Sequence, residues 1–273
     1  MSAPTADAIL DASPRAEQGP RLEIRGLGKS FAVPGEGTRS VLRDVELTVR
    51  PGEFTAMIGP SGCGKSTLFN IISGLEPPSG GTVTLSGESL VGRPGQVAYM
   101  PQKDLLFPWR TVRDNTILGL QVGGMRRRAA RERVDELFAT FGLDGYQDAY
   151  PFEMSGGMRQ RAALLRTVVM DRPLLLLDEP FGALDSLTRT EMQLWLAGMC
   201  QRFQWTILLI THDIREAVFL ADTVHVLSPR PATIVQGIEV DIPRPRGIDT
   251  FTSPGFIDIE RRLLHLLEGG GAR

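Results

Sequence analysis

The sequence lacks any long hydrophobic run. Its longest apolar stretches, such as residues 174–177, have the length of a strand, whereas a membrane-spanning helix requires roughly 18 apolar residues. The first twenty residues contain three acidic side chains and no extended apolar core, so they do not resemble a secretory signal. These absences predict a cytoplasmic chain without a membrane span.

Cysteine and excess charge are also scarce. Cys63 and Cys200 are the only two cysteines in 273 residues, and we expect no disulfide between them in a reducing compartment. Cys63 lies in a glycine-rich loop, where it is either a reactive thiol near backbone N–H groups or a small filler side chain. The net charge of −2 excludes a nucleic-acid binder held by bulk charge, so no nucleic-acid partner is expected.

Lysine is the third scarce residue, since only three of the 30 basic residues are lysines. One of them, Lys65, lies between an apolar run at residues 54–58 and a helical pattern at residues 68–72. The intervening stretch is a Walker A phosphate loop, because glycines let backbone N–H groups surround phosphate oxygens and the helix N-terminus favours an anion. Its residues are Gly59, Pro60, Ser61, Gly62, Cys63, Gly64, Lys65, Ser66 and Thr67.

The choice of lysine at this position is informative. A compact ammonium fits inside a phosphate loop where a planar guanidinium would not, and elsewhere this chain uses arginine almost throughout. A glycine-rich turn that binds no ligand would not explain the exception. We therefore expect Lys65 to contact the β- and γ-phosphates of a nucleotide and Ser66 to hold Mg²⁺.

Four consecutive leucines at residues 174–177 precede Asp178 and Glu179. Such a run is typical of a strand that is buried on both faces of a parallel sheet, and the carboxyl ends of these strands form the ligand-binding edge of α/β sheets. We expect Asp178 to share the Mg²⁺ with Ser66. Glu179 is placed to orient and polarise an attacking water.

Three further positions each have two interpretations. Ser155 begins the sequence Ser155-Gly156-Gly157-Met158, which is either an ordinary helix N-cap or a second phosphate site with open N–H groups. His212 follows an apolar strand at residues 206–210 and is either structural or a γ-phosphate contact. Phe31 is either a stacking surface for a nucleobase or a core residue, and the residue type favours the core.

The remaining segments predict a domain with a disordered leader at residues 1–20. We expect one antiparallel sheet near residues 21–24 and 41–47, and a second antiparallel pair at residues 82–86 and 97–100. A helical region is predicted at residues 112–141, strands at 223–227 and 233–236, and a helix capped by Ser253 that runs to residue 267.

Two surface features have more than one interpretation. The loop at residues 101–109 carries apolar side chains between prolines, so it either packs on its own domain or contacts another protein. The polar face of the helical region is either a partner or membrane patch, or a solvated face, which is the more common case. Its basic residues are Arg126, Arg127, Arg128, Arg131 and Arg133.

In their order along residues 21–245, these motifs resemble those of the ATPase subunit of ABC transporters. The resemblance rests on Walker A at 59–67, Gln102, the signature at 154–158, Walker B at 174–179, Asp185 in the sequence Ala-Leu-Asp, and His212. It implies an α/β fold: a P-loop NTPase (RecA-like) core with an antiparallel β subdomain and a helical signature subdomain at about 103–165. Residues 246–273 would form a C-terminal helix and tail.

The resemblance implies a role for each matching residue. It assigns Phe31 to stacking on adenine, Gln102 to sensing Mg²⁺ and the attacking water, Glu179 to the catalytic base and His212 to a γ-phosphate switch. Ser155, Gly156, Gly157 and Met158 would act on the ATP bound by a second copy of the chain, and Asp185 would cross the interface between the copies. The implied cofactors are ATP and Mg²⁺.

The same resemblance implies the partners. Two copies would form a head-to-tail dimer around two ATP molecules at the cytoplasmic face of the cell membrane. The dimer would drive separate permease subunits, served by an extracellular or periplasmic substrate-binding protein. A soluble ABC ATPase of translation or DNA repair, an exporter ATPase and a regulatory nucleotide sensor are the alternatives.

Segments 101–109, 154–158 and 228–231 are similar to those of importers of nitrate, aliphatic sulfonates, taurine and pyrimidine precursors. Met154 and Met158 depart from the leucine and glutamine of the broader family. Of these two, Met158 suits the importer group.

Overall fold

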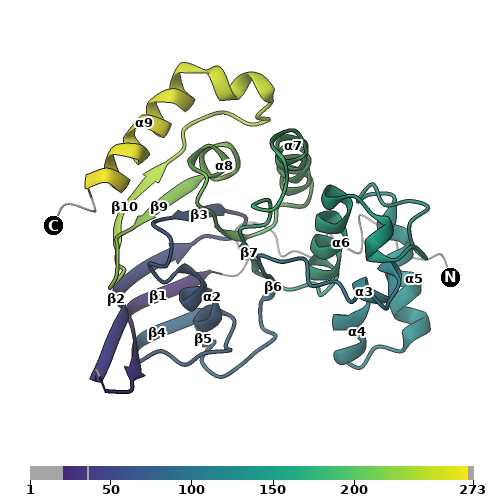
Figure 1. Ribbon diagram of the computed structural model, residues 1–273, viewed down its shortest axis with the longest axis horizontal. Helices are drawn as coiled ribbons and strands as arrows, with labels where there is room; N and C mark the ends of the chain where they lie inside the picture. Colours follow the sequence, from purple (N-terminus) through teal and green to yellow (C-terminus); the bar gives the residue numbers. More distant parts are fainter. Residues whose placement is uncertain (1–20, 36, 270–273) are drawn as a thin grey trace.

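The computed structural model describes residues 21–35 and 37–269, so the leader expected at residues 1–20 lies outside the described residues. Figure 1 shows two β-sheets with covering helices, and a group of helices, α3 to α6, beside them. Within the described ranges, no helix combines the length and the apolar character needed to cross a membrane.

A six-stranded sheet forms the centre of the fold. Its strand order is β10-β9-β3-β8-β7-β6; all neighbouring pairs are parallel except β10 with β9. All residues of β3, β7 and β8 are buried, which confirms the strand predicted from the leucine run. The strands are β3 Phe54–Ile58, β6 Ala98–Met100, β7 Leu175–Asp178, β8 Ile207–Ile210, β9 Thr223–Leu227 and β10 Ile234–Glu239.

The second sheet is antiparallel, with the order β2-β1-β4-β5. Its strands are β1 Leu22–Val33, β2 Gly37–Val49, β4 Gly80–Leu85 and β5 Glu88–Ser89. The prediction that residues 97–100 pair with 82–86 is wrong, because β6 lies parallel to β7 in the other sheet. A three-residue strand has too little periodicity to reveal its partner strand. Ala98 and Met100 are buried, and this burial favours the pairing of β6 with β7.

Alternate residues of the central strands face two different cores. Met57, Leu176 and Leu208 join the core shared with α2 and the antiparallel sheet, while Ala56, Leu177 and Leu209 face the helices on the other side. This alternation explains why the strands are apolar throughout. The helices are α2 Lys65–Ile72, α6 Gly156–Val168, α7 Ser186–Phe203, α8 Ile214–Leu220 and α9 Pro254–Gly269, with the short 3₁₀ turns Pro151–Glu153 and Ile248–Thr252.

The helical region at residues 112–141 is not one helix. It consists of α3 Val112–Thr116, α4 Leu118–Val122 and α5 Arg127–Phe138. Gly123 caps α4 and Gly124 has a φ of 90°, a conformation that glycine adopts without strain and that stops the helix. The predicted apolar stripe is confirmed, since Ala130, Val134, Leu137, Phe138 and Phe141 are all buried.

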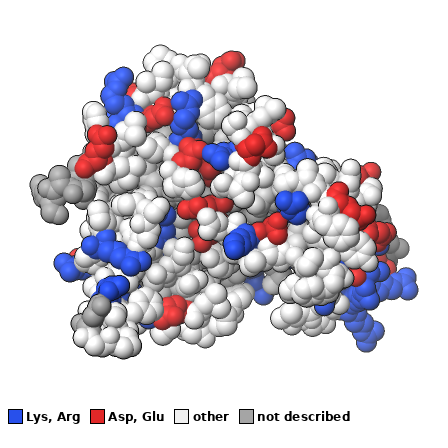
Figure 2. Space-filling view, in the orientation of Figure 1, with Lys and Arg blue, Asp and Glu red and all other residues white. Residues whose placement is uncertain are grey.

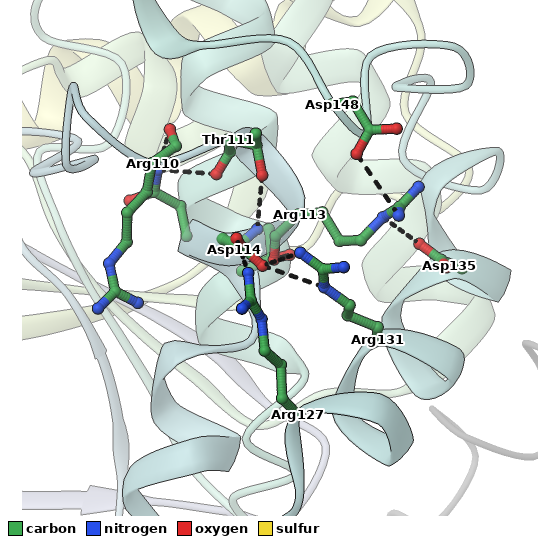
Figure 3. Close-up of polar contacts among 10 residues, drawn as sticks. Arg110, Thr111, Arg113, Asp114, Arg127, Arg131, Asp135 and Asp148 are labelled. Carbon is green, nitrogen blue, oxygen red and sulfur yellow. Dashed lines mark hydrogen bonds and ion pairs between the residues drawn. The ribbon is translucent and has the colours of Figure 1, made fainter.

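Ion pairs hold the short helices together. Asp114 of α3 accepts hydrogen bonds from Arg127 at 2.6 Å and from Arg131 at 2.8 Å, both on α5 (Figure 3). Burial acts to raise the pKa of Asp114, but the bonds from Arg131 and Arg127 outweigh it, so this pKa lies below its ordinary value. These contacts fix α5 against α3.

The basic face of α5 is therefore largely paired within the chain. Besides Arg127 and Arg131, Arg128 pairs with Glu132 at 2.9 Å and Arg133 with Asp171 at 3.4 Å. Figure 2 shows basic side chains gathered over this end of the molecule, with acidic side chains close by. The structure supports a solvated, internally paired face.

Candidate functional site

The phosphate loop connects β3 to α2 at the carboxyl edge of the central sheet. Gly62 and Gly64 have φ values of 73° and 129°, which other residues rarely adopt. A side chain at Gly64 would also lie 2.9 Å from Val41 Cγ1. Two glycines of the motif are thus required by the backbone conformation itself.

Lys65 is folded into the loop that precedes it. Its Nζ donates hydrogen bonds to the carbonyl oxygens of Gly59 at 2.7 Å and Pro60 at 3.0 Å, and the residue is 7% exposed. The ammonium is therefore already positioned beside the loop before a ligand binds. Phosphate oxygens would replace the carbonyls as its partners.

A cavity of about 190 Å³ opens at the loop. It has two cationic side chains and one carboxylate, being lined by Ser61, Gly62, Gly64, Lys65, Ser66, Thr67, Glu179 and Arg230. A larger cavity of about 490 Å³ lies at the opposite, amino ends of β3 and β9. We place the functional site at the smaller cavity because only there does a phosphate loop meet the carboxyl ends of the strands.

Two predicted site residues, Gln102 and His212, converge on one carboxylate oxygen of a third, Glu179. Gln102 Nε2 donates a 2.9 Å hydrogen bond to Glu179 Oε2, and His212 Nδ1 lies 3.1 Å from the same oxygen. The three residues follow β6, β7 and β8, which are adjacent parallel strands. The sheet order thus brings together residues that the chain separates.

The backbone at Glu179 is unusual. Its φ is 46°, a left-handed conformation that costs free energy in a residue other than glycine and is common at functional sites. Its N–H donates to the carbonyl of Ile210 at 2.8 Å, which ties the end of β7 to the end of β8. This turn directs the carboxylate toward the phosphate cavity, of which Glu179 is a lining residue.

Asp178 is buried at the end of β7 and accepts a 3.2 Å hydrogen bond from the hydroxyl of Tyr99. Burial raises the pKa of Asp178, against hydrogen bonds from Tyr99 and Ser66 that act to lower it. Burial, followed by the charge of Asp178, raises the pKa of Tyr99 in turn. Since Ser66 acts on the pKa of Asp178, the two predicted Mg²⁺ ligands lie close together.

The donor set fits Mg²⁺. A carboxylate, a hydroxyl and an amide oxygen, from Asp178, Ser66 and Gln102, are hard oxygen ligands of the kind that this ion prefers. Among the residues that the structure describes, there is no group of three or more His, Cys, Asp or Glu side chains able to hold a metal. Phosphate oxygens and water would complete the coordination, as is usual for Mg²⁺.

The signature residues begin α6 rather than bordering the cavity. Ser155 is the N-cap, and its Oγ accepts a hydrogen bond from Met158 N at 3.3 Å. Gly157 packs closely on α7, since a Cβ there would lie 2.9 Å from Thr188 Cγ2. None of these residues, nor Asp185 at the N-cap of α7, lines the phosphate cavity of the same chain.

Phe31 is exposed near the end of β1, with 39% of its surface accessible. The Nζ of Lys29 lies 4.7 Å from the centre of its ring. The preference for a core phenylalanine, drawn from residue type, is therefore wrong. Burial of the apolar side chains of β1 ends before this position, so the Phe31 side chain is accessible to a ligand.

Sequence reasoning missed two residues of the site. Tyr99 of β6 donates a hydrogen bond to Asp178. No motif marks this tyrosine, and its proximity to Asp178 was missed because the strand partner of β6 was predicted wrongly. Arg230 lines the phosphate cavity, whereas the segment that contains it was noted only as a feature of the importer group. Cys63 is 2% exposed, which favours the filler side chain over the reactive thiol.

Comparisons with known proteins identify relatives of the chain. Residues 42–182 match the family model described as ABC transporter. The aliphatic sulfonates import ATP-binding protein SsuB of Bacillus licheniformis is 42% identical over 247 residues, covering 90% of this chain and 94% of the relative. The nitrate import ATP-binding protein NrtC of Synechococcus elongatus is 43% identical over 251 residues, covering 90% of this chain and 38% of NrtC.

A solved structure has the same fold. The dimeric structure of MJ0796, a bacterial ABC transporter cassette, superposes with a TM-score of 0.69 and 27% identity. The match covers 83% of this chain and all of the cassette. A second structure of the same cassette, a post-hydrolysis state bound to ADP and Pi, matches with a TM-score of 0.69 and 26% identity.

Proposed function

Because the chain belongs to the ABC transporter family of ATP-binding proteins, we propose that it is the ATPase subunit that energises import of a small solute through a separate membrane permease. The solute belongs to the class of nitrate, sulfonates, taurine or pyrimidine precursors. The observation that carries the proposal is the convergence of Gln102 and His212 on the Glu179 carboxylate beside the phosphate loop.

Each residue then has a step in hydrolysis. The loop N–H groups and Lys65 bind the β- and γ-phosphates. Glu179 accepts a proton from the attacking water, while Gln102 and His212 hold its carboxylate in position. Ser66, Asp178 and Gln102 would hold Mg²⁺, which when bound would supply charge neutralisation to the phosphates. Phe31 stacks on the adenine ring.

A second copy of the chain completes the site. Ser155, Gly156, Gly157 and Met158 present the N-terminus of α6 away from the chain's own cavity, so they meet the γ-phosphate on the partner in a head-to-tail dimer. Asp185 crosses that interface. ATP favours the closed dimer because it contacts both copies, and hydrolysis releases them. We assign this cycle to residues 21–245, with a helical part at about 103–165 and a C-terminal helix and tail at 246–273.

An exposed apolar surface beside α3 is suited to the permease. Phe107 stacks on Trp109 and Tyr150 on Phe152, with ring centres 5.1 and 5.5 Å apart. Trp109 and Phe152 are 71% and 73% exposed. Backbone hydrogen bonds from residues 112 and 113 to residues 149 and 147 hold the two segments near each other. Exposed aromatic groups of this kind mark a protein interface, which supports a location beside a permease at the cytoplasmic face of the membrane.

The test is a detergent pull-down of the tagged chain from its native membranes. We expect a polytopic permease and its binding protein to copurify, and a Trp109→Ser, Phe152→Ser variant to lose both while still binding ATP. The recovered binding protein is then screened against nitrate, sulfonates and pyrimidine precursors. Recovery only with ribosomal or DNA-bound partners would overturn the transport assignment and leave the ATPase chemistry intact.

A further inference from the structure

A loop between β9 and β10 lies next to the phosphate loop. Its Ala232 donates a 2.8 Å hydrogen bond to Val41 O and accepts one of 2.9 Å from Arg43 N, which fastens the loop to β2. Ser228 and Thr233 close its base through a backbone hydrogen bond of 3.0 Å. Pro229 and Pro231 restrict the backbone further. The segment is thus a held turn and not a freely moving one.

This turn presents Arg230 at the rim of the phosphate cavity. The preceding Leu227 packs against the start of the phosphate loop, since a Cβ at Gly59 would lie 2.9 Å from Leu227 Cβ. The Arg230 Nη2 atom lies 4.0 Å from the position that a Cβ of Gly62 would occupy. Arg230 and Lys65 are the two cations in the cavity lining.

The guanidinium of Arg230 has no protein partner in the described part of the chain. Glu179 is the one carboxylate in the same lining, but its Oε2 is already engaged by Gln102 and His212. Many other arginines of the chain are paired with carboxylates or backbone carbonyls, including Arg113, Arg189, Arg244 and Arg246. An exposed and unpaired guanidinium at a phosphate cavity is placed for an anion that is not part of the protein.

The chemistry of the cavity identifies that anion. A nucleoside triphosphate carries several negative charges, of which one lysine and one divalent ion neutralise only part. The planar fork of arginine matches phosphate oxygens and forms charge-assisted hydrogen bonds to them. We propose that Arg230 binds oxygens of the nucleotide's phosphate chain, as a second cation beside Lys65. This inference rests on the proposed phosphate site.

The experiment is equilibrium binding of a fluorescent ATP analogue, and of ATP by competition, to Arg230→Ala, Arg230→Lys and Lys65→Ala. Protein is kept dilute so that dimerisation contributes little. Arg262→Ala, an exposed arginine on α9, is the matched control for the loss of one positive charge. We expect Arg230→Ala to raise the Kd for ATP about five- to tenfold, with Arg230→Lys intermediate and Arg262→Ala unchanged. We expect the difference in Kd between Arg230→Ala and wild type to become smaller as the salt concentration rises, because salt screens the charge of Arg230.

Comparing the binding of ADP and ATP shows which phosphate Arg230 contacts. An equal loss of affinity for ADP and ATP in Arg230→Ala supports a contact to the α- or β-phosphate. A loss of affinity confined to ATP supports a contact to the γ-phosphate. Thermal unfolding confirms that the Arg230 variants are folded, which is expected because the side chain is exposed.

Two results overturn the inference. One is an unchanged Kd in Arg230→Ala together with lost binding in Lys65→Ala, which leaves the proposed function in place. The other is an unchanged Kd in Arg230→Ala together with loss of the ATP-dependent dimer, measured by light scattering. That result would mean that Arg230 acts at the interface with the second copy and not on the phosphates. If Lys65→Ala also binds ATP normally, the proposed phosphate site itself is wrong.

Discussion

Gln102 and Glu179, which are 77 residues apart in the chain, are joined by a 2.9 Å hydrogen bond from the Gln102 amide to Oε2 of Glu179. His212 Nδ1 approaches the same oxygen to 3.1 Å. These two contacts on one oxygen restrain the carboxylate and leave its other oxygen available to accept a proton from water. The arrangement makes Glu179 the centre of the proposed hydrolysis.

Replacing Glu179 with glutamine tests this assignment. We expect Glu179→Gln to bind ATP and to accumulate as a stable dimer, while hydrolysis falls at least about 100-fold because the amide cannot accept the proton. Phosphate release and light scattering with Mg-ATP measure the two effects. Glu191→Gln, the same change at an exposed position of α7, serves as the control. Wild-type turnover in Glu179→Gln would remove the base assignment.

Lys65 supplies the second prediction. We expect Lys65→Ala to weaken ATP binding at least about tenfold, because it removes charged hydrogen bonds to the phosphates. Lys65→Arg is expected to bind poorly as well, since a planar guanidinium does not fit among the carbonyls of Gly59 and Pro60 that now hold the ammonium. Calorimetric titration measures both. Normal affinity in Lys65→Ala would contradict the phosphate-loop assignment.

The hydroxyl of Tyr99 is predicted to act on metal binding through Asp178. In Tyr99→Phe the ring is retained, with its edge contact to Phe69 at a centroid distance of 5.9 Å, but the hydrogen bond to Asp178 is lost. We expect the Mg²⁺ concentration for half-maximal hydrolysis to rise about tenfold, while ATP binding without Mg²⁺ stays unchanged. An unaltered Mg²⁺ titration would show that Tyr99 only fills space.

Glu216 on α8 predicts a pH dependence of stability. Burial, reinforced by the charge of Asp213, raises the pKa of Glu216 from its ordinary 4.5 to about 8. Between these values the native chain retains a proton that the unfolded chain releases, so stability contributed by the neutral acid is lost as pH rises toward 8. Below pH 4.5 Glu216 is protonated in both the folded and the unfolded chain, so this loss of stability disappears.

Glu216→Gln removes this titration while keeping the shape of the side chain. We expect its melting temperature, relative to wild type, to be about 3 °C or more higher at pH 8 than at pH 5. Other titrating groups cancel in the comparison because both proteins contain them. The same difference at both pH values would mean that Glu216 is ionised in the native state.

Local patterns were sufficient for several parts of the fold. The glycines and Lys65 identified the phosphate loop, and the leucine run identified β7 as a strand buried on both faces. Ser253 was predicted to cap the last helix, and its Oγ accepts a hydrogen bond from Phe256 N at 3.3 Å. In each case the relevant interactions join residues that are near in sequence or follow one clear periodicity.

Other parts depended on contacts that sequence proximity does not reveal. The partner of β6 was predicted wrongly because three residues carry no register information. Residues 112–141 were predicted as one helical region, but Gly123 and Gly124 interrupt it, and the pieces are held by ion pairs from Asp114 to α5. Residue type favoured a core position for Phe31, whereas the resemblance assigned it to stacking on adenine; residue type alone does not distinguish a packed ring from an exposed one.

The sequence by itself determined the identity of the chemical groups: a phosphate loop, a buried aspartate followed by a glutamate, a glutamine and a histidine, each at the end of a strand. Only the tertiary structure decided that Gln102 and His212 meet on one oxygen of Glu179, that Tyr99 supports Asp178, and that Arg230 borders the phosphate cavity. The physical reason is the order of strands in the sheet. Strand order is set by long-range burial, whereas motifs are set by local backbone geometry.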